Sequence, residues 1–443
     1  MLSIPAPREM YCLLETSFVS HKSWKKKRSE SSLSLAISSK IIFLLSGAYT
    51  AFLNNSRRSK NKISILVPSP NRAVLSILRC ISSHCLYVDF DCSKTGKSLG
   101  GGIRGIVILI CILTMKIQLV HKYEDLISID NLLSAWKEFI KGKRNKKDVQ
   151  EFQFNLMDNI LSLHYDLKDY TYKHGEYECF KISDPKPRII HKASVRDRLL
   201  HHAVYRILYP FFDKTFVPDS FSCRNNKGTH KAINRFREFV RIVSKNNTKT
   251  CWVLKCDIKK FFASIDKDIL TNILKKYIPD KDIIGLLEEI IFSFKSTGLP
   301  LGNLTSQLFS NIYLNELDQF VKHKLKAKHY IRYADDFVIL SRDKKWLENI
   351  VLKIEEFLFN KLKLNFHPNK VFIKTLSSGV DFLGWVNFFD HRILRRATKR
   401  RMLGKLKNNS NRETVNSYSG LLKHGNTLKI QNRVVGIIND VTY

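Results

Sequence analysis

The stretch IRYADDFVIL, residues 331–340, places two adjacent carboxylates, Asp335 and Asp336, inside a run of apolar residues. Its pattern predicts two short strands joined by a tight turn at Ala334 and Asp335. Two like charges at a turn repel each other and resist removal from water, so a fold keeps them where a cation compensates. Mg²⁺ is typically held by one or two carboxylates together with substrate phosphates. The stretch therefore predicts a divalent-metal site, with a solvated turn as the alternative for an isolated Asp pair.

A second strand upstream supplies a further carboxylate. In CWVLKCDIKKFF, residues 251–262, alternation puts Trp252, Leu254, Cys256 and Ile258 on one side and Val253, Lys255 and Asp257 on the other. Because Asp257 ends the polar side, we choose it as the partner of Asp335 and Asp336. Two divalent ions held a few ångströms apart by such carboxylates can activate one oxygen and stabilise the leaving oxygen of a phosphoryl transfer.

The surrounding segments alternate helices with strand pairs, which indicates an α+β fold. Apolar residues recur at helical spacing in residues 195–211, 306–320 and 346–362, and the first of these helices is also basic. No internal repeat is visible. The 443 residues, 44% of them hydrophobic, are enough to bury a full core.

The net charge of the chain indicates its class of binding partner, and its cysteines indicate its cellular compartment. The chain has 75 Lys and Arg against 40 Asp and Glu, a formal net charge of +35. This excess favours a polyanionic partner over the alternative of a merely solvated basic surface. The nine cysteines include no C-x-x-C pair, which predicts reduced thiols in a cytoplasmic protein rather than a zinc or disulfide framework.

The first 114 residues differ from the rest, and we assign them no function. Their two apolar runs, IIFLLSGAYTAFL and GIVILICILTM, are shorter than the ~20 residues that cross a bilayer, so no membrane partner is expected. A regular helical pattern begins at Met115. Our hypothesis is that Met115 is the physiological start and that residues 1–114 are an upstream extension.

The carboxylate-bearing stretches belong to a longer series with a family resemblance. DIKKFFASID and YADD resemble motifs A and C of reverse transcriptases, and GLPLGNLTSQ, KLKLNFHPNK and FLGW resemble motif B, motif D and the primer-grip segment, in the family's order. The resemblance covers roughly residues 150–425. It implies a right-hand polymerase fold: helices and fingers in 115–250, a palm with an antiparallel sheet in 251–390, and a short basic helical thumb in 391–443, after a poorly defined extension in 1–114.

The implied activity is RNA-directed DNA synthesis, in which the enzyme adds dNTPs to a DNA or RNA primer on an RNA template. It would use two Mg²⁺ ions, for which Mn²⁺ could substitute. By position in the motifs, Asp257 and Asp335 would hold both metals, Asp336 would contribute less directly, and Ile258 would lend a backbone carbonyl. Phe262 occupies the steric-gate position, where a ring under the sugar excludes a 2′-hydroxyl. Its alternative is an ordinary core Phe.

Other site residues follow from the same resemblance. In the fingers, Lys186 and Arg188 are candidates for triphosphate contact, since cationic groups stabilise the charge of the transition state. Arg196 and Arg198 are candidates for the template backbone. Lys370 resembles the residue that protonates pyrophosphate, with a surface lysine as an equal alternative. The primer-grip positions, predicted to contact template and primer, are Phe382, Leu383, Gly384 and Trp385.

Motif B departs from the common pattern. Intron-encoded and retron enzymes read Gln-Gly and end in Ser-Pro, whereas this chain has Leu301-Gly302 and Ser306-Gln307. That variant is similar to reverse transcriptases of diversity-generating retroelements, in which it accompanies error-prone copying of template adenines and which work with a small basic accessory protein. Gly302 would let the backbone approach the nascent pair. Gln307 would bond a base or sugar edge, or cap the following helix.

Three interpretations of the whole chain stay open. The first is a reverse transcriptase of a diversity-generating element. The second is a defence-associated or retron-like enzyme with the same chemistry, and the third is a non-catalytic, maturase-like RNA-binding factor.

Overall fold

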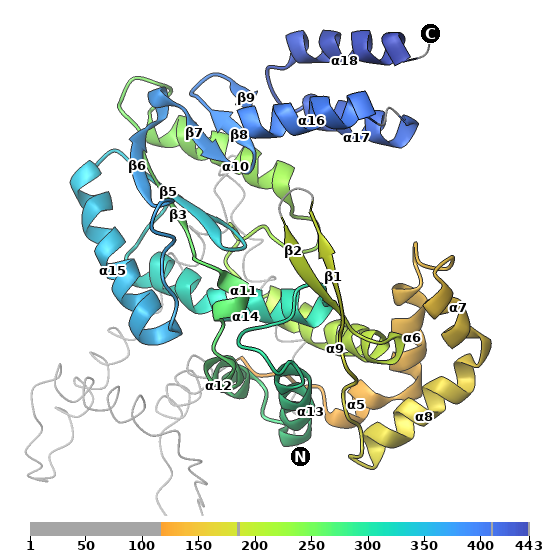
Figure 1. The fold of residues 1–443 in the computed structure, drawn as a ribbon. Helices are drawn as coiled ribbons and strands as arrows, with labels where there is room; N and C mark the ends of the chain where they lie inside the picture. The colour runs from red at the N-terminus through yellow and green to blue at the C-terminus, as the bar shows by residue number, and fades with distance from the viewer. Residues whose placement is uncertain (1–116, 184–186, 409–410, 442–443) are drawn as a thin grey trace, which may run out of the picture. The chain divides into compact units, whose positions relative to one another are not determined.

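The computed structural model describes residues 117–183, 187–408 and 411–441, so the predictions for 1–114 and for Lys186 lie outside the described residues. The described residues belong to one compact unit that begins at Ile117, and this unit holds every element discussed below (Figure 1). It opens with helices that flank the long helix α9: α5 (Tyr123–Ile127), α6 (Ile129–Phe139), α7 (Lys147–Phe154) and α8 (Leu156–Lys168).

A two-stranded hairpin and two helices precede the central sheet. Strands β1 (Glu178–Ile182) and β2 (Arg188–Lys192) pair antiparallel, and α9 (Val195–Asp213) and α10 (Thr229–Val243) follow. Helix α9 begins where Ser194 accepts a hydrogen bond from the Asp197 amide, an N-cap that satisfies an otherwise unpaired donor. Its range confirms the helix predicted over 195–211.

The central sheet is antiparallel, with strand order β4-β5-β3-β6. Its members are β3 (Trp252–Asp257), β4 (Tyr330–Tyr333), β5 (Asp336–Ser341) and β6 (Phe372–Thr375). The predicted hairpin is confirmed as β4 and β5, joined at Ala334 and Asp335. Strand β3 alternates as predicted: Leu254 and Cys256 join one hydrophobic cluster, and Val253 joins the other.

Both faces of this sheet are covered, which explains its apolar sequence. On one face, Leu254, Cys256, Phe337 and Ile339 pack in the large core with helices α14 (Leu304–Gln319) and α15 (Lys344–Leu362). On the other face, Val253, Val338 and Leu340 pack against α10 (Figure 1). The strands of a sheet buried on both sides read as nearly continuous apolar runs. The carboxylates lie at one end of the sheet, just past this packing.

The remaining elements connect and extend the sheet. Between β3 and α14 lie α11 (Phe261–Ser264), α12 (Lys267–Tyr277) and α13 (Lys281–Phe292), and a π-helical turn, Phe320–Lys324, ends α14. A short 3₁₀ turn, Leu376–Ser378, follows β6. A three-stranded sheet, ordered β7-β8-β9, comes next: β7 (Val380–Phe382), β8 (Trp385–Asn387) and β9 (Arg392–Leu394). Helices α16 (Arg396–Asn408), α17 (Arg412–Leu422) and α18 (Leu428–Val441) end the described chain. Strand β9 thus lies within the range predicted as thumb.

No helix among the described residues is both long and apolar enough to cross a membrane. The cysteines of the described part, Cys179, Cys223, Cys251 and Cys256, are all free thiols.

Candidate active site

The β4–β5 turn presents the two adjacent carboxylates. Ala334 adopts a left-handed conformation with φ of 54°, and Asp335 follows it at the tip. Beneath the turn, Arg332 is fully buried and donates a hydrogen bond of 3.2 Å to the Ala334 carbonyl. The same guanidinium makes a two-point ion pair with buried Asp318, at 2.7 Å to each carboxylate oxygen. Arg332 therefore fixes the backbone that carries Asp335.

Asp257 lies directly across from this turn. In the antiparallel register of β3 and β5 it is the partner of Asp336, and the Ile258 amide donates to the Asp335 carbonyl at 3.3 Å. Residues separated widely in the sequence thus meet at one end of the sheet. The structure brings together the three predicted carboxylates and the Ile258 backbone.

Burial raises the pKa of two of the three carboxylates, Asp335 and Asp336. The pKa of Asp335 is raised by burial and then by the nearby charge of Asp257. The pKa of Asp336 is raised to about 7, chiefly by burial, while Lys255 opposes the increase. Its Oδ1 atom is buried with no hydrogen-bond partner. Buried carboxylates that share a site favour the protonated form unless a cation is supplied.

Two lysines supply part of that positive charge. Lys370 Nζ lies 3.0 Å from Asp257 Oδ1. Lys255 Nζ lies 3.4 Å from Asp336 Oδ2 and donates to the Asp381 carbonyl on β7 at 2.8 Å. Lys255 therefore connects the carboxylate end of the central sheet to the β7–β8 hairpin. The sequence placed Lys255 on the same side of its strand as Asp257, but its partners were not predicted.

The fit of this site to a divalent cation rests on the donor set. Three carboxylate residues occupy neighbouring backbone positions, and one buried carboxylate oxygen, Asp336 Oδ1, lacks a hydrogen-bond partner. Carboxylate oxygens are the ligands that suit Mg²⁺. Within 117–183, 187–408 and 411–441, however, no three His, Cys, Asp or Glu side chains already stand close enough together to hold a metal ion. Binding of a metal ion would therefore require the carboxylate side chains to turn toward a common point. It would also require Lys370 to break its ion pair with Asp257.

Phe262, the residue predicted to lie under the nucleotide sugar, belongs to helix α11. Phe262 is half-buried, and its carbonyl accepts a hydrogen bond of 2.8 Å from the Leu299 amide. Gly298 packs so closely here that a Cβ would lie 2.1 Å from the Phe262 carbonyl oxygen. The backbone carrying Phe262 is thus held in place by the motif B loop. The steric-gate role itself stays a prediction.

Motif B packs directly against the fingers strand β2. A Cβ at Gly302, whose φ is +116°, would meet Ile190 Cγ2 at 2.7 Å. The His191 amide donates to the Leu301 carbonyl at 2.8 Å, and Asn303 Nδ2 donates to the His191 carbonyl at 3.1 Å. Gly302 is therefore required by the approach of β2, a neighbour that the sequence did not indicate.

Gln307 lines a hollow of about 360 Å³ together with Gly302, Phe139, Phe180 and Arg198. Helix α14 has Asn303 at its N-cap and no side chain bonded there, so the alternative that Gln307 caps the helix is not realised. Its contact with a base stays a prediction.

The cationic fingers residues have different surroundings. Arg188, the exposed first residue of β2, exerts a charge effect that lowers the pKa of Asp335 against the larger effect of burial. Arg196 pairs with Asp166 of α8. Arg198 pairs with Asp148 of α7 at 2.6 Å and lines the Gln307 hollow. Both arginines thus join α9 to another helix of this chain, and Arg198 also lines the hollow.

The primer-grip residues divide into core and tip. Phe382 and Trp385 are 0% and 1% exposed, so their side chains pack in the protein. Leu383 and Gly384 form the turn between β7 and β8 with φ of 51° and 85°. Of the four, only Leu383 and Gly384 lie at the tip of the hairpin, where the predicted primer contact would be made. The sequence motif did not distinguish these tip residues from the buried ones.

Comparisons with known proteins show which proteins this chain is similar to. Residues 179–386 match the family model described as reverse transcriptase (RNA-dependent DNA polymerase). Protein YkfC of Escherichia coli is 26% identical over 258 residues, 49% of this chain and 66% of that protein. The group II intron-encoded protein LtrA of Lactococcus lactis is 24% identical over 327 residues, 56% of this chain and 52% of that protein. The chain thus spans less than two thirds of these relatives. Among solved structures, apo telomerase from Candida tropicalis covers 55% of this chain and 59% of its own at a TM-score of 0.37 and 14% identity.

Proposed function

We propose that this chain, whose residues 179–386 form a reverse transcriptase domain, adds deoxynucleotides to a primer annealed to an RNA template. The observation that carries the proposal is the meeting of Asp257 with the Asp335–Asp336 turn at one end of a buried sheet. A fold bears the cost of burying like charges together where their function requires it.

The protein's own groups would share the work as follows. Asp257, Asp335 and the Ile258 carbonyl would hold the two Mg²⁺ ions, which supply charge neutralisation at the reacting phosphate and activation of the primer hydroxyl. The third carboxylate, Asp336, would be held in position by its ion pair with Lys255. Arg188 would contact the triphosphate, and Phe262 would exclude a ribose 2′-hydroxyl.

Lys370 would have two positions in this scheme. Its ion pair with Asp257 neutralises that carboxylate when no metal is bound. A lysine displaced by the metal would be available to donate a proton to departing pyrophosphate. This role and the phosphate contact of Lys186 belong to the proposal.

Primer extension by the full chain on poly(rA)/oligo(dT) with Mg²⁺ tests the activity. We expect Asp335→Ala and Asp335→Asn to abolish incorporation, and Asp158→Ala, an exposed acid on α8, to leave it unchanged. Thermal unfolding would establish that each variant is folded. Undiminished synthesis by a folded Asp335→Asn variant would refute the site assignment.

For the biological role, we propose service in a diversity-generating retroelement, with a small basic accessory protein as partner. The support is Leu301 and Gln307 in motif B, with Gln307 lining a hollow beside the fingers. Sequencing of products from a mixed RNA template would then show errors concentrated opposite adenine, and Leu301→Gln would reduce them. Errors spread evenly over the bases would favour the retron-like or defence-associated alternative.

A non-catalytic, maturase-like role is the second candidate, because relatives include the group II intron-encoded protein LtrA and the nuclear intron maturase 1 of Arabidopsis thaliana. Tight RNA binding without extension on any primer, with Mg²⁺ or Mn²⁺, would favour it.

A further inference from the structure

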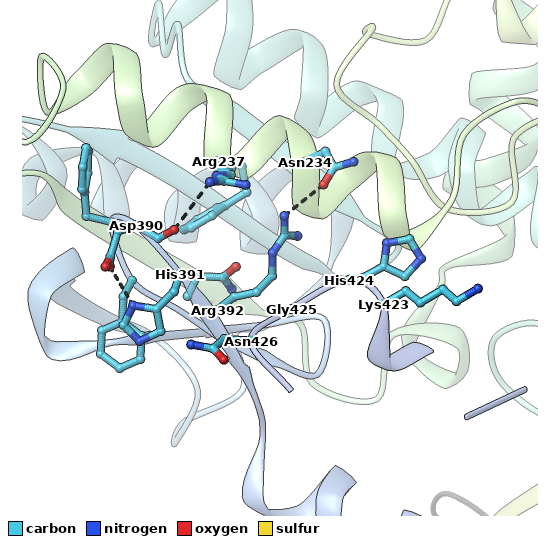
Figure 2. A pocket seen from close by; sticks show the side chains of 13 residues that line it. Asn234, Arg237, Asp390, His391, Arg392, Lys423, His424, Gly425 and Asn426 are labelled. Carbon is cyan, nitrogen blue, oxygen red and sulfur yellow. Dashed lines mark hydrogen bonds and ion pairs between the residues drawn. The ribbon is translucent and has the colours of Figure 1, made fainter. Parts of the chain in front are cut away.

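A second polar hollow, of about 420 Å³, lies outside the candidate active site (Figure 2). Its walls come from helix α10, from the turn between β8 and β9, and from the connection between α17 and α18. The residues used below are Asn234, Arg237, Asp390, Arg392, His424 and Asn426. None of them belongs to the carboxylate site or to the predicted nucleotide contacts.

Two hydrogen bonds and a pair of stacked rings join the three walls, so the hollow is a built feature. Arg392 Nη2 donates to Asn234 Oδ1 at 3.1 Å, which ties β9 to α10. The Asn426 amide donates to the Arg392 carbonyl at 2.8 Å, which ties β9 to the α17–α18 connection. The rings of His230 and His424 stack with centroids 3.6 Å apart, which ties that connection to α10.

The hollow gathers positive charge that its own acid does not balance. Neither Arg237 nor Arg392 has a carboxylate within ion-pair distance in the described part of the chain. Burial lowers the pKa of Arg392, and the charge of Arg237 lowers it further. Asp390, the acidic residue of the lining, is already bonded through Oδ1 to His391 at 2.7 Å.

Other arginines nearby show that unpaired guanidinium groups are not general here. On the same helix, Arg235 pairs with Asp219 and Glu238, each at 2.8 Å. Arg224, just before α10, pairs with Asp213 at 2.7 Å. Arg237 instead donates only a long bond, 3.5 Å, to the Asp390 carbonyl (Figure 2). The two arginines of the hollow are therefore available to an external anion.

We propose that this hollow binds a phosphate group of an RNA strand, at a contact separate from the polymerase site. Guanidinium groups match phosphate oxygens through paired N–H donors, and the chain's net charge of +35 suits a polyanion. Arg237, Asn234 and Asn426 are exposed, so the hollow is open enough for a strand to lie across it, whereas a small ligand is normally enclosed over most of its surface. The inference deepens the proposed function and rests on nucleic acid being the partner.

The test compares RNA binding by matched charge variants of the full chain. Arg237→Gln/Arg392→Gln removes the site, and Arg241→Gln/Arg342→Gln removes the same charge at exposed positions that do not line the hollow. Fluorescence anisotropy with a labelled structured RNA of roughly 40 nucleotides, without dNTPs, would be measured over a range of KCl. We expect the site variant to bind RNA about tenfold or more weakly than the wild type. Its slope of log K against log salt should fall by about 0.7 for each phosphate that the variant no longer neutralises.

Three outcomes would overturn the proposal. The first is an equal loss of affinity in the control variant, which would indicate general surface charge. The second is a matching loss of extension on a short primer–template, which would place the hollow in the polymerase cleft. The third is competition by inorganic phosphate or ATP with no change in RNA affinity between variants, which would identify a small-molecule site.

The design separates this proposal from the proposed function. Binding is read without nucleotides, so an inactive polymerase leaves the result interpretable. Because Arg392 joins β9 to α10, its replacement could disturb the fold; Arg237→Gln alone, at an exposed position, is the second variant, expected to lose about threefold or more in affinity. Asn234→Ala, which breaks the wall bond without removing charge, should lose less affinity than either arginine variant.

Discussion

The buried Arg332 beneath the β4–β5 turn gives the sharpest prediction. We consider Arg332→Met, which removes the guanidinium and keeps a similar apolar volume. In the structure Arg332 and Asp318 are both 0% exposed and joined by two bonds of 2.7 Å. Arg332 also donates to Asn311 Oδ1 and to the Ala334 carbonyl, each at 3.2 Å. The substitution leaves the Asp318 carboxylate buried without its cation.

The expected loss of stability follows from that unpaired charge. Removing one partner of a buried ion pair costs about 3–5 kcal/mol. For a unit the size of residues 117–443, an unfolding entropy of ~2.1 cal/mol/K per residue gives about 0.7 kcal/mol/K, so 4 kcal/mol lowers Tm by about 6 °C.

Calorimetry of the wild type and the variant measures this shift, with Arg342→Met, at an exposed position, as the control. Asp318→Leu/Arg332→Met should recover about half of the loss. The uncompensated charge is gone, but Asn311 Oδ1 has lost its Arg332 donor and the Tyr330 hydroxyl, which donates to Asp318 at 2.6 Å, has lost its acceptor. Extension at 25 °C should fall even though most molecules are folded, since the Ala334 backbone loses its support. A Tm within 1 °C of the wild type, or a double variant no better than the single one, would refute the reasoning.

Three further perturbations address other parts of the molecule. Phe262→Ala should raise incorporation of ribonucleotides relative to deoxynucleotides by tenfold or more, measured in single-nucleotide extension; an unchanged ratio would assign Phe262 to the core alone. Lys255→Met removes a charge-assisted bond to Asp336 worth about 1.5–3 kcal/mol, so kcat/KM for extension should fall roughly 10- to 150-fold, with Lys255→Arg less affected; equal rates would show that the lysine does not position the carboxylate. Burial lowers the pKa of His201 to about 3 and of His202 to about 4. As pH falls below 6.5, both histidines take up protons in the unfolded chain but not in the folded one. The free energy of unfolding should therefore decrease by on the order of 5 kcal/mol between pH 6.5 and 4. His201→Phe/His202→Phe should flatten that decrease in urea titrations, and an unaltered pH dependence would contradict the assignment.

The strands and turn of the site could be predicted from the sequence because their signals are local. Alternation over residues 252–257 assigns Leu254 and Val253 to opposite faces of the strand without any knowledge of what packs there. The structure confirms both assignments. The adjacent acids Asp335 and Asp336 mark the turn in the same way. Helix α9 was equally predictable, since its apolar spacing and its Ser194 cap are both short-range features.

Partners across long sequence separations could not be predicted. The basic face of α9 suggested template binding, yet Arg196 bonds to Asp166, 30 positions upstream. No residue near Arg332 in the sequence identifies Asp318 as its counter-ion. The sequence around Gly302 likewise does not indicate that β2 packs against it. The FLGW segment likewise reads as one motif, although burial separates Phe382 and Trp385 from the tip residues. In each case the local pattern indicates the face of an element, while tertiary packing decides what that face meets.

The two lysines at the carboxylates show why that distinction matters for mechanism. Lys255 is 12% exposed and is held from the other side by the Asp381 carbonyl, so moving it would leave both a buried cation and a hairpin carbonyl without a partner. Lys370 is 40% exposed, and its ammonium group meets the site through a single carboxylate oxygen of Asp257. Solvent reaches this ion pair from the lysine side, although Asp257 itself is only 17% exposed, so the lysine can exchange its carboxylate partner for water more easily than Lys255 can. We infer that a metal entering the site would displace Lys370 and leave Lys255 in place. Of the two, Lys370 is then the lysine able to move toward a phosphate, and the proposed role as a proton donor requires that movement.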